Sequence, residues 1–237
     1  MNAGGPPAPT AFDAHAASYD DDLARGLSLA GEDKAYYAEA RMRWLAHRLA
    51  GRGAGPPSLA LDFGCGDGAS TPLLREILKA GSVIGLDVST ALLDVARERH
   101  REPGIRFSTL ADFPPDGRGD LAFTNGVFHH IPPAQRAEAL VFVRASLRPG
   151  GYFAFWENNP WNPGTVAVMR RIPFDRDAIM ISPTEARRLL GAAGFEVLSV
   201  DSLFYFPRFL RWLRPLEPAL SRLPLGGQYL ALARRPR

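Results

Sequence analysis

Apolar residues along this chain form short runs that alternate with segments of helical periodicity. The runs are rich in Leu, Val, Ile and Phe and end at glycines or carboxylates, as is typical of strands buried in a sheet. Strands are predicted to begin at Leu59, Gly81, Ile105, Gly119, Tyr152, near Val197 and at Gln228. Helices are predicted at 33–49, 69–78, 89–100 and 134–147, with another from Ser182 to Gly191. This alternation predicts an α/β fold with a mostly parallel sheet and helices on both faces.

The length of 237 residues and the hydrophobic content of 46% suit one α/β domain. We expect a disordered tail at 1–11 and a single domain at 12–237, with N-terminal lid helices at 12–57, a core at 58–203 and 226–235, and an aromatic and basic insertion at 204–225. The strand from Gln228 should lie antiparallel beside the preceding strand, because both come at the end of the chain and a hairpin-like excursion joins them.

Charge and composition narrow the class of protein. The net charge of +3 is too small to indicate a nucleic-acid partner, and the single cysteine excludes an internal disulfide framework. No apolar run reaches about 18 residues, and the N-terminus has no basic region followed by an apolar one. We therefore expect a cytoplasmic protein.

A glycine-rich loop follows the strand at 59–62. Glycines at 64, 66 and 68 permit backbone angles closed to other residues and let a ligand approach the main chain. The spacing also satisfies the dinucleotide-binding pattern, but Asp62 and Asp67 would repel a pyrophosphate. Two carboxylates suit a ligand with a ribose, an adenine and a cationic amino-acid end, as in S-adenosylmethionine.

At this loop the sequence resembles the class I S-adenosylmethionine-dependent methyltransferases of the small-molecule (quinone, sugar and natural-product) branch. Their first motif has the form acid-x-Gly-x-Gly-x-Gly, which Asp62, Gly64, Gly66 and Gly68 match. The resemblance implies a Rossmann-like, seven-stranded, mostly parallel sheet with an antiparallel last strand. It also implies S-adenosylmethionine as cofactor and S-adenosylhomocysteine as product.

Several residues are expected to bind this cofactor: Tyr19, Asp62, Gly64, Cys65, Gly66, Asp87, Val88, Asp112, Phe113 and Asn125. Asp87 ends a strand and could accept both ribose hydroxyls, or could cap the next helix. The resemblance assigns Asp112 to the adenine amino group and Phe113 to the ring; a plain turn before two prolines is the alternative for Asp112. Residues 12–20 are similar to a family segment that places Tyr19 in a lid, against the alternative of an amphipathic helix.

The run 125–131, which includes His129 and His130, resembles the corresponding loop of small-molecule methyltransferases. Either histidine is a candidate general base or substrate ligand, with a hydrogen-bonded structural histidine as the alternative. Only one can face the site if the backbone is extended. We expect no metal, because no Asp, Glu or His stands nearby at regular ligand spacing.

Glu157 follows the predicted fifth strand and is a third candidate base. Asn158, Asn159 and Trp161 come directly after it and are candidate substrate contacts. An in-line displacement of the methyl group needs a base only when the nucleophile carries a proton of high pKa.

Residues 204–216 are aromatic and basic; from Pro207 to Arg237 seven arginines stand against Glu217 alone. This segment is predicted to be a lid over the acceptor, a weak membrane-surface contact, or an insertion packed on the sheet or a dimer partner. A monomer or a homodimer is expected.

The predicted function is methyl transfer from S-adenosylmethionine to a small-molecule acceptor at O, N or C. A dinucleotide-dependent oxidoreductase and a non-catalytic S-adenosylmethionine-binding relative are the alternatives. Tight NAD(P) binding would favour the former, and cofactor binding without turnover the latter.

Overall fold

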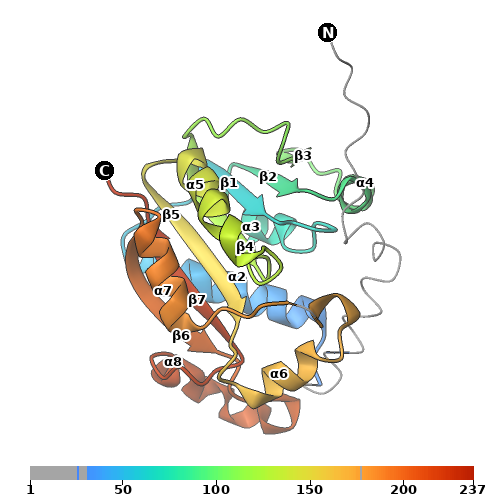
Figure 1. Ribbon diagram of the computed structural model, residues 1–237, viewed down its shortest axis with the longest axis vertical. Coiled ribbons are helices and arrows are strands. Elements are labelled where there is room, and N and C mark those ends of the chain that lie inside the picture. Colours follow the sequence, from blue (N-terminus) through green and yellow to red (C-terminus); the bar gives the residue numbers. More distant parts are fainter. Residues whose placement is uncertain (1–25, 27–30, 177) are drawn as a thin grey trace.

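A computed structural model describes residues 26, 31–176 and 178–237. Within these residues seven strands form one sheet with helices packed around it (Figure 1). The strands are β1 Leu59–Phe63, β2 Ser82–Asp87, β3 Ile105–Thr109, β4 Gly119–Asn125, β5 Leu147–Asn158, β6 Glu196–Leu203 and β7 Gln228–Arg234. The α-helices are α2 Lys34–Ala50, α3 Thr71–Glu76, α4 Thr90–Arg99, α5 Arg136–Ser146, α6 Pro163–Met169, α7 Pro183–Ala192 and α8 Glu217–Leu220. Short 3-10 helices are η2 Pro133–Gln135, η3 Pro173–Asp175 and η4 Arg208–Leu216.

The strand order is β3-β2-β1-β4-β5-β7-β6. Strands β1 to β5 pair in parallel, and β7 is antiparallel to both β5 and β6. The predicted fold class is confirmed, including the antiparallel last strand. Parallel pairing brings the carboxyl ends of β1, β4 and β5 to one edge of the sheet, where open α/β sheets bind ligands.

Alternating side chains on the strands build a core on each face. On β5, Phe153 and Phe155 join the cluster that includes Leu140 of α5 and Leu190 of α7. Their neighbours Ala154 and Trp156 join the opposite cluster, which contains Met42 and Leu45 of α2 and Leu74 of α3. Helices therefore cover both faces of the sheet, as the period-two pattern of a buried strand requires.

The predicted fifth strand was too short. It begins at Leu147, because residues up to Gly151 continue the sheet beside the end of β7. There Gly150 N donates to Arg235 O and Arg235 N donates to Gly151 O. The Pro-Gly-Gly sequence, which is typical of a turn, thus forms the first part of β5. The local sequence pattern does not reveal its pairing with the end of β7.

In the part of the chain that the structure describes, every helix is too short or too polar to cross a membrane.

Candidate active site

A cavity of about 620 Å³ lies at the carboxyl ends of the central strands. Its floor comes from the loops after β1 and β4, and its walls come from α2, α6, η3 and residues 204–209. The volume falls within the usual range of small-molecule sites. Segments far apart in the sequence therefore meet over the sheet edge at which ligands were expected.

The glycine loop is shaped for close approach. Gly64 has φ +73°, and a Cβ there would lie 2.3 Å from Val127 Cγ2. Gly66 has φ +54°, and no atom lies within 4 Å of the place where its Cβ would stand. The first glycine is needed for packing, whereas the second leaves open space facing the cavity.

Asp62 lies one residue before the end of β1, next to this loop, and is buried. Its Oδ2 accepts a hydrogen bond of 2.7 Å from Thr71 Oγ1. Burial raises the pKa of the Asp62 carboxyl to about 7, with the nearby charges of Asp87 and Asp67 acting in the same direction. A cationic ligand group beside Asp62 would offset that cost.

The second carboxylate of the loop is already paired. Asp67 accepts from Lys34 Nζ and forms an ion pair with Arg99. Its charge is therefore largely balanced by the protein, so Asp67 opposes a phosphate less than the loop sequence alone indicates. The tertiary partners come from α2 and α4, which the loop sequence does not reveal.

Asn125 and Cys65 both line the cavity, as expected of cofactor contacts. The side-chain oxygen of Asn125 is buried and has no hydrogen-bond partner among the described residues. Burying such a group costs free energy unless it forms a hydrogen bond. We therefore expect a hydrogen-bond donor of a ligand beside Asn125 Oδ1. Burial raises the pKa of the Cys65 thiol well above its usual range, which makes Cys65 a packing residue rather than a nucleophile.

The Asp87 carboxylate fixes the backbone of the glycine loop. Its Oδ2 accepts from Gly66 N at 2.8 Å and its Oδ1 accepts from Ser89 N at 2.9 Å. The helix N-cap is Ser89, whose hydroxyl accepts from Leu92 N. The alternative of an Asp87 cap is therefore wrong, and its role toward a ribose stays a prediction.

Four of the predicted cofactor contacts lie outside the cavity lining: Asp87, Val88, Asp112 and Phe113. Val88 is 52% exposed, and Asp112 lies in an exposed turn where it accepts from Thr109 Oγ1. Phe113 is 9% exposed and packs in the core against Phe142. The turn at Asp112 sends the Phe113 side chain into the interior, so the predicted contact of Phe113 with a ring has no support from the cavity. Tyr19 lies outside the described residues.

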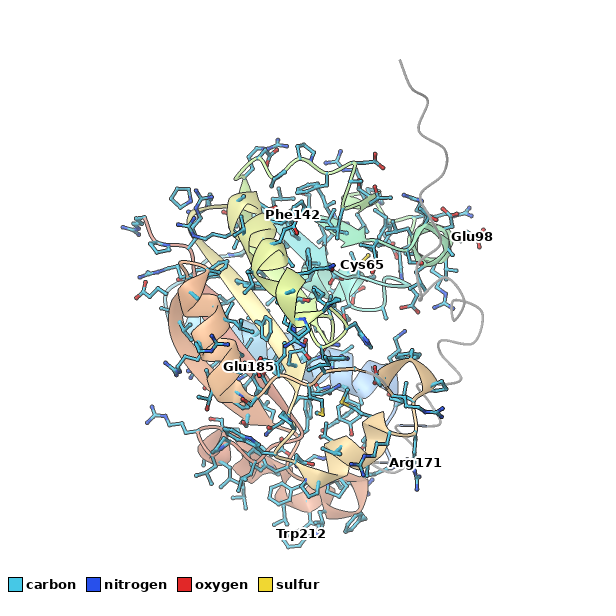
Figure 2. All side chains as sticks on the ribbon, viewed as in Figure 1. Cys65, Glu98, Phe142, Arg171, Glu185 and Trp212 are labelled. Atoms are coloured by element: carbon cyan, nitrogen blue, oxygen red, sulfur yellow. The ribbon has the colours of Figure 1, made fainter. Side chains whose placement is uncertain are left out.

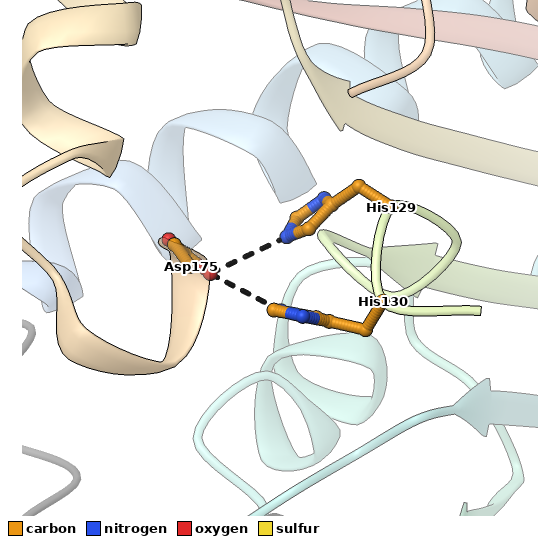
Figure 3. Close-up of side chains that lie close together, drawn as sticks. All are labelled: His129, His130 and Asp175. Carbon is orange, nitrogen blue, oxygen red and sulfur yellow. Dashed lines mark ion pairs between the residues drawn. The ribbon is translucent and has the colours of Figure 1, made fainter. Parts of the chain in front are cut away.

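Both histidines after β4 face one carboxylate, Asp175 (Figure 3). His130 Nε2 lies 3.1 Å and His129 Nε2 lies 3.5 Å from Asp175 Oδ1. The backbone here is a turn, in which His130 N donates to Val127 O. The expectation that only one histidine can face the site assumed an extended backbone and was wrong. The absence of an acid at ligand spacing in the sequence did not report Asp175, which reaches the histidines from η3.

Glu157 is buried behind this pair and does not line the cavity. Its Oε1 accepts from Phe128 N at 2.8 Å, and its Oε2 lies 2.6 Å from His129 Nδ1. Burial opposes protonation of His129, but the carboxylates of Glu157 and Asp175 outweigh it and raise the His129 pKa to about 10. Neither Glu157 nor His129 is therefore suited to be a general base, and His130 is the remaining candidate.

Arg136, which the sequence did not single out, joins the histidine loop to the segment that carries Asp175. It is 1% exposed, and its Nε donates to Phe128 O and Ile131 O. Its Nη2 donates to Ile179 O at 2.7 Å. Arg136 is the first residue of α5. Its position in the sequence does not distinguish it from an arginine on the exposed face of a helix.

Of the three predicted substrate contacts near the end of β5, only one lines the cavity. Asn158 lines the cavity, and its Oδ1 accepts from Gln228 Nε2. Asn159 is fully buried, and its amide donates to Pro224 O and Gly226 O, so it holds the chain before β7. Trp161 is 46% exposed and away from the cavity. Substrate contact by Asn159 and Trp161 is thus not supported, because the chain turns at Asn159.

One cavity wall is aromatic. Tyr37 of α2 meets Phe204 edge to face at 4.9 Å between ring centroids, and Phe206 and Phe209 extend the wall. The Glu217 carboxylate accepts hydrogen bonds from the backbone N–H groups of residues 204–206. The outer side of the segment is exposed, and Figure 2 shows Trp212 at the edge of the molecule, pointing away from it.

Comparison with known proteins agrees with this geometry. Residues 60–151 match the family described as "Methyltransferase domain". The chain is 33% identical over 179 residues to a trans-aconitate 2-methyltransferase of Methylobacterium nodulans, which covers 75% of this chain and 64% of that protein. It is 30% identical over 193 residues to a trans-aconitate 2-methyltransferase of Variovorax paradoxus, which covers 72% of this chain and 74% of that protein. The chain thus spans less than two thirds of the first relative.

The fold has solved counterparts. The structure of the complex between the Haloferax volcanii Trm112 methyltransferase activator and a methyltransferase superposes with a TM-score of 0.66 and 22% identity, covering 97% of this chain and 100% of that one. The chain belongs to the class I S-adenosylmethionine-dependent methyltransferases, which confirms the family expected from its first motif.

Proposed function

We propose that this chain transfers a methyl group from S-adenosylmethionine to a small-molecule acceptor bound in the cavity. The observation that carries the proposal is the joint placement of two features in one cavity. One is the open glycine loop with Asp62 and the unpaired Asn125 oxygen, and the other is the aromatic wall of Tyr37, Phe204 and Phe206.

The residues of the loop fit the cofactor. Asp62 brings a carboxyl group whose ionised form a cationic ligand group would favour, Gly66 gives room at the main chain, and Asn125 offers an acceptor. Asp87 holds the backbone N–H groups of Gly66 and Ser89 beside this loop, and binding of the ribose hydroxyls by Asp87 is part of the proposal. When bound, S-adenosylmethionine supplies an electrophilic methyl group on a sulfonium.

The chain contributes alignment and exclusion of water. The walls from α2, η3 and residues 204–209 surround the acceptor beside the glycine loop. Holding two reactants in line is worth effective molarities of about 10⁵ to 10⁸ M in oriented systems. His130 would take the proton from an acceptor that reacts through a hydroxyl, and an ionised carboxylate would need no base.

We infer that the acceptor is a small carboxylic acid with an apolar body. The relatives are named for trans-aconitate, and Arg41 brings a guanidinium to the cavity, where its Nη1 donates to Gln228 Oε1. The aromatic wall of Tyr37, Phe204 and Phe206 favours an acceptor with more apolar surface than a tricarboxylate.

The test is transfer of radiolabelled methyl from S-adenosylmethionine to a panel of trans-aconitate, aromatic carboxylic acids and phenols. We expect labelling of a carboxylic acid as a methyl ester, which mild base hydrolyses. A base-stable product would contradict the carboxylate acceptor but not methyl transfer. Cofactor binding without labelling of any acceptor would identify a non-catalytic relative.

We also propose a weak membrane-surface contact through residues 204–216. Phe209 is 77% and Trp212 is 72% exposed, and Arg208 and Arg211 are exposed beside them. We expect co-sedimentation with anionic vesicles that weakens in Trp212→Ser and at high salt. Equal sedimentation of the variant would contradict this contact.

A further inference from the structure

The cluster of His129, His130 and Asp175 has no assigned task if the acceptor is a carboxylate. Such an acceptor needs no base, and Asp175 would repel it. The three side chains nevertheless converge, with one ligand atom from each lying within 4.8 Å of the others (Figure 3). We propose that this cluster is a binding site for a divalent transition-metal ion such as Zn²⁺ or Co²⁺.

The distances suit a shared ion. Asp175 Oδ1 lies 3.1 Å from His130 Nε2 and 3.5 Å from His129 Nε2. Ligand atoms about 2.0–2.2 Å from a zinc ion are about 3 to 3.5 Å apart in tetrahedral or octahedral geometry. Two imidazole nitrogens and one carboxylate oxygen favour Zn²⁺, Co²⁺ or Fe²⁺ over Mg²⁺ or Ca²⁺, which prefer oxygen alone.

One ring nitrogen of His129 is directed into the cluster. His129 is 3% exposed, and among the described residues its Nε2 makes no hydrogen bond beyond the 3.5 Å ion pair with Asp175 Oδ1. Its other nitrogen, Nδ1, is held at 2.6 Å by Glu157 Oε2, which is itself fixed by Phe128 N. A carboxylate that orients a histidine in this way is the usual support of a metal-binding imidazole.

The competing occupant of the cluster is a proton. A protonated His129 between Glu157 and Asp175 would balance the same two carboxylates. Metal binding at Nε2 would release that proton to solvent, so the two arrangements exclude each other. Arg136 lies behind the loop; its Nε and Nη2 donate to the carbonyl oxygens of Phe128, Ile131 and Ile179, and its Nη1 forms an ion pair with Glu185.

The ion would be open to the cavity. Both histidines and Asp175 line it, so three protein ligands leave positions free on the cavity side. An ion there would offset the negative charges of Glu157 and Asp175 and could take a carboxylate oxygen of the acceptor. This acceptor role rests on the proposed function, whereas metal binding itself does not.

The experiment uses untagged full-length protein freed of metal by chelation and titrated with Co²⁺, followed by equilibrium dialysis and visible absorption. We expect one Co²⁺ per chain, with an absorption spectrum of histidine-bound Co²⁺. Affinity should fall at least about tenfold in Asp175→Asn and in His130→Gln, and about 10- to 100-fold in Glu157→Gln. His47→Gln, an exposed histidine of α2, is the matched control and should change nothing.

Absence of stoichiometric binding to the unmodified protein would overturn the site and leave the protonated His129 in its place. Equal affinity in Asp175→Asn and His130→Gln would overturn it too. If the variants do not fold, X-ray absorption spectroscopy of the Zn²⁺-loaded unmodified protein tests the site instead. The proposal requires two imidazole ligands on the zinc, and a spectrum without them would overturn it. Titration with S-adenosylhomocysteine in parallel reports on the proposed function separately.

Discussion

Glu157 Oε2 and His129 Nδ1 lie 2.6 Å apart, and both side chains are almost fully buried. Glu157→Ala would leave the His129 nitrogen and Phe128 N without their acceptor, at a cost of about 1–3 kcal/mol for each unpaired group. Glu157→Gln keeps an acceptor oxygen and should cost less. Urea unfolding of the two variants checks this order; equal stability of Glu157→Ala and the unmodified protein would contradict it.

Gly64 and Gly66 should respond differently to alanine. In Gly64→Ala the new Cβ meets Val127 at 2.3 Å, so we expect a marked loss of stability. In Gly66→Ala the Cβ enters open cavity space, so stability should change by only about 1–2 kcal/mol from the left-handed backbone. Affinity for S-adenosylhomocysteine should nevertheless fall at least about tenfold, measured by calorimetry. Unchanged affinity would place the cofactor away from this loop.

The Asp62 carboxyl predicts a particular dependence of stability on pH. Its pKa is raised from 3.8 to about 7, so its contribution to stability is complete below about pH 3.8 and is lost as the pH rises towards 7. The melting temperature of Asp62→Asn relative to the unmodified protein should therefore rise across this window. S-adenosylhomocysteine, which carries an ammonium group, should reduce the difference.

Asp120→Asn is the control of opposite sign. Asp120 bonds Arg148 and the N–H groups of Ser58 and Leu59, and its pKa is lowered. Its contribution is present above the unfolded pKa and is lost as the pH falls, so Asp120→Asn should be less stable near pH 7 and converge with the unmodified protein in acid. Parallel pH profiles for the two variants would contradict both assignments.

Arg136 should control the histidine loop without touching the cofactor. Arg136→Met removes donors from three carbonyl groups, and hydrogen bonds to charged groups are worth about 1.5–3 kcal/mol each. We expect a clear loss of stability and of methyl transfer, with affinity for S-adenosylhomocysteine changed less than threefold once folded protein is measured. Arg43→Met, which removes an exposed ion pair with Glu39, should cost about 0–1 kcal/mol.

The sheet and the glycine loop could be predicted because their signals are local. Strand periodicity, glycine spacing and Asp62 at a strand end depend on neighbouring residues alone, and the structure reproduces them. The antiparallel β7 also followed from chain order.

The other parts of the site depend on contacts between distant segments. Asp175 reaches the histidines from η3, and Arg136 fixes that approach through Ile179. Asn159 was predicted as a site residue from its position after the fifth strand, but its amide donates hydrogen bonds to the carbonyl oxygens of Pro224 and Gly226. No local pattern reports which way such a side chain turns.

Calorimetric titration with S-adenosylhomocysteine and, separately, with NAD(H) tests the central claim most directly. We predict micromolar binding of S-adenosylhomocysteine that is lost in Gly66→Val and no binding of NAD(H). Binding of NAD(H) in place of S-adenosylhomocysteine would contradict the assignment of this cavity to methyl transfer.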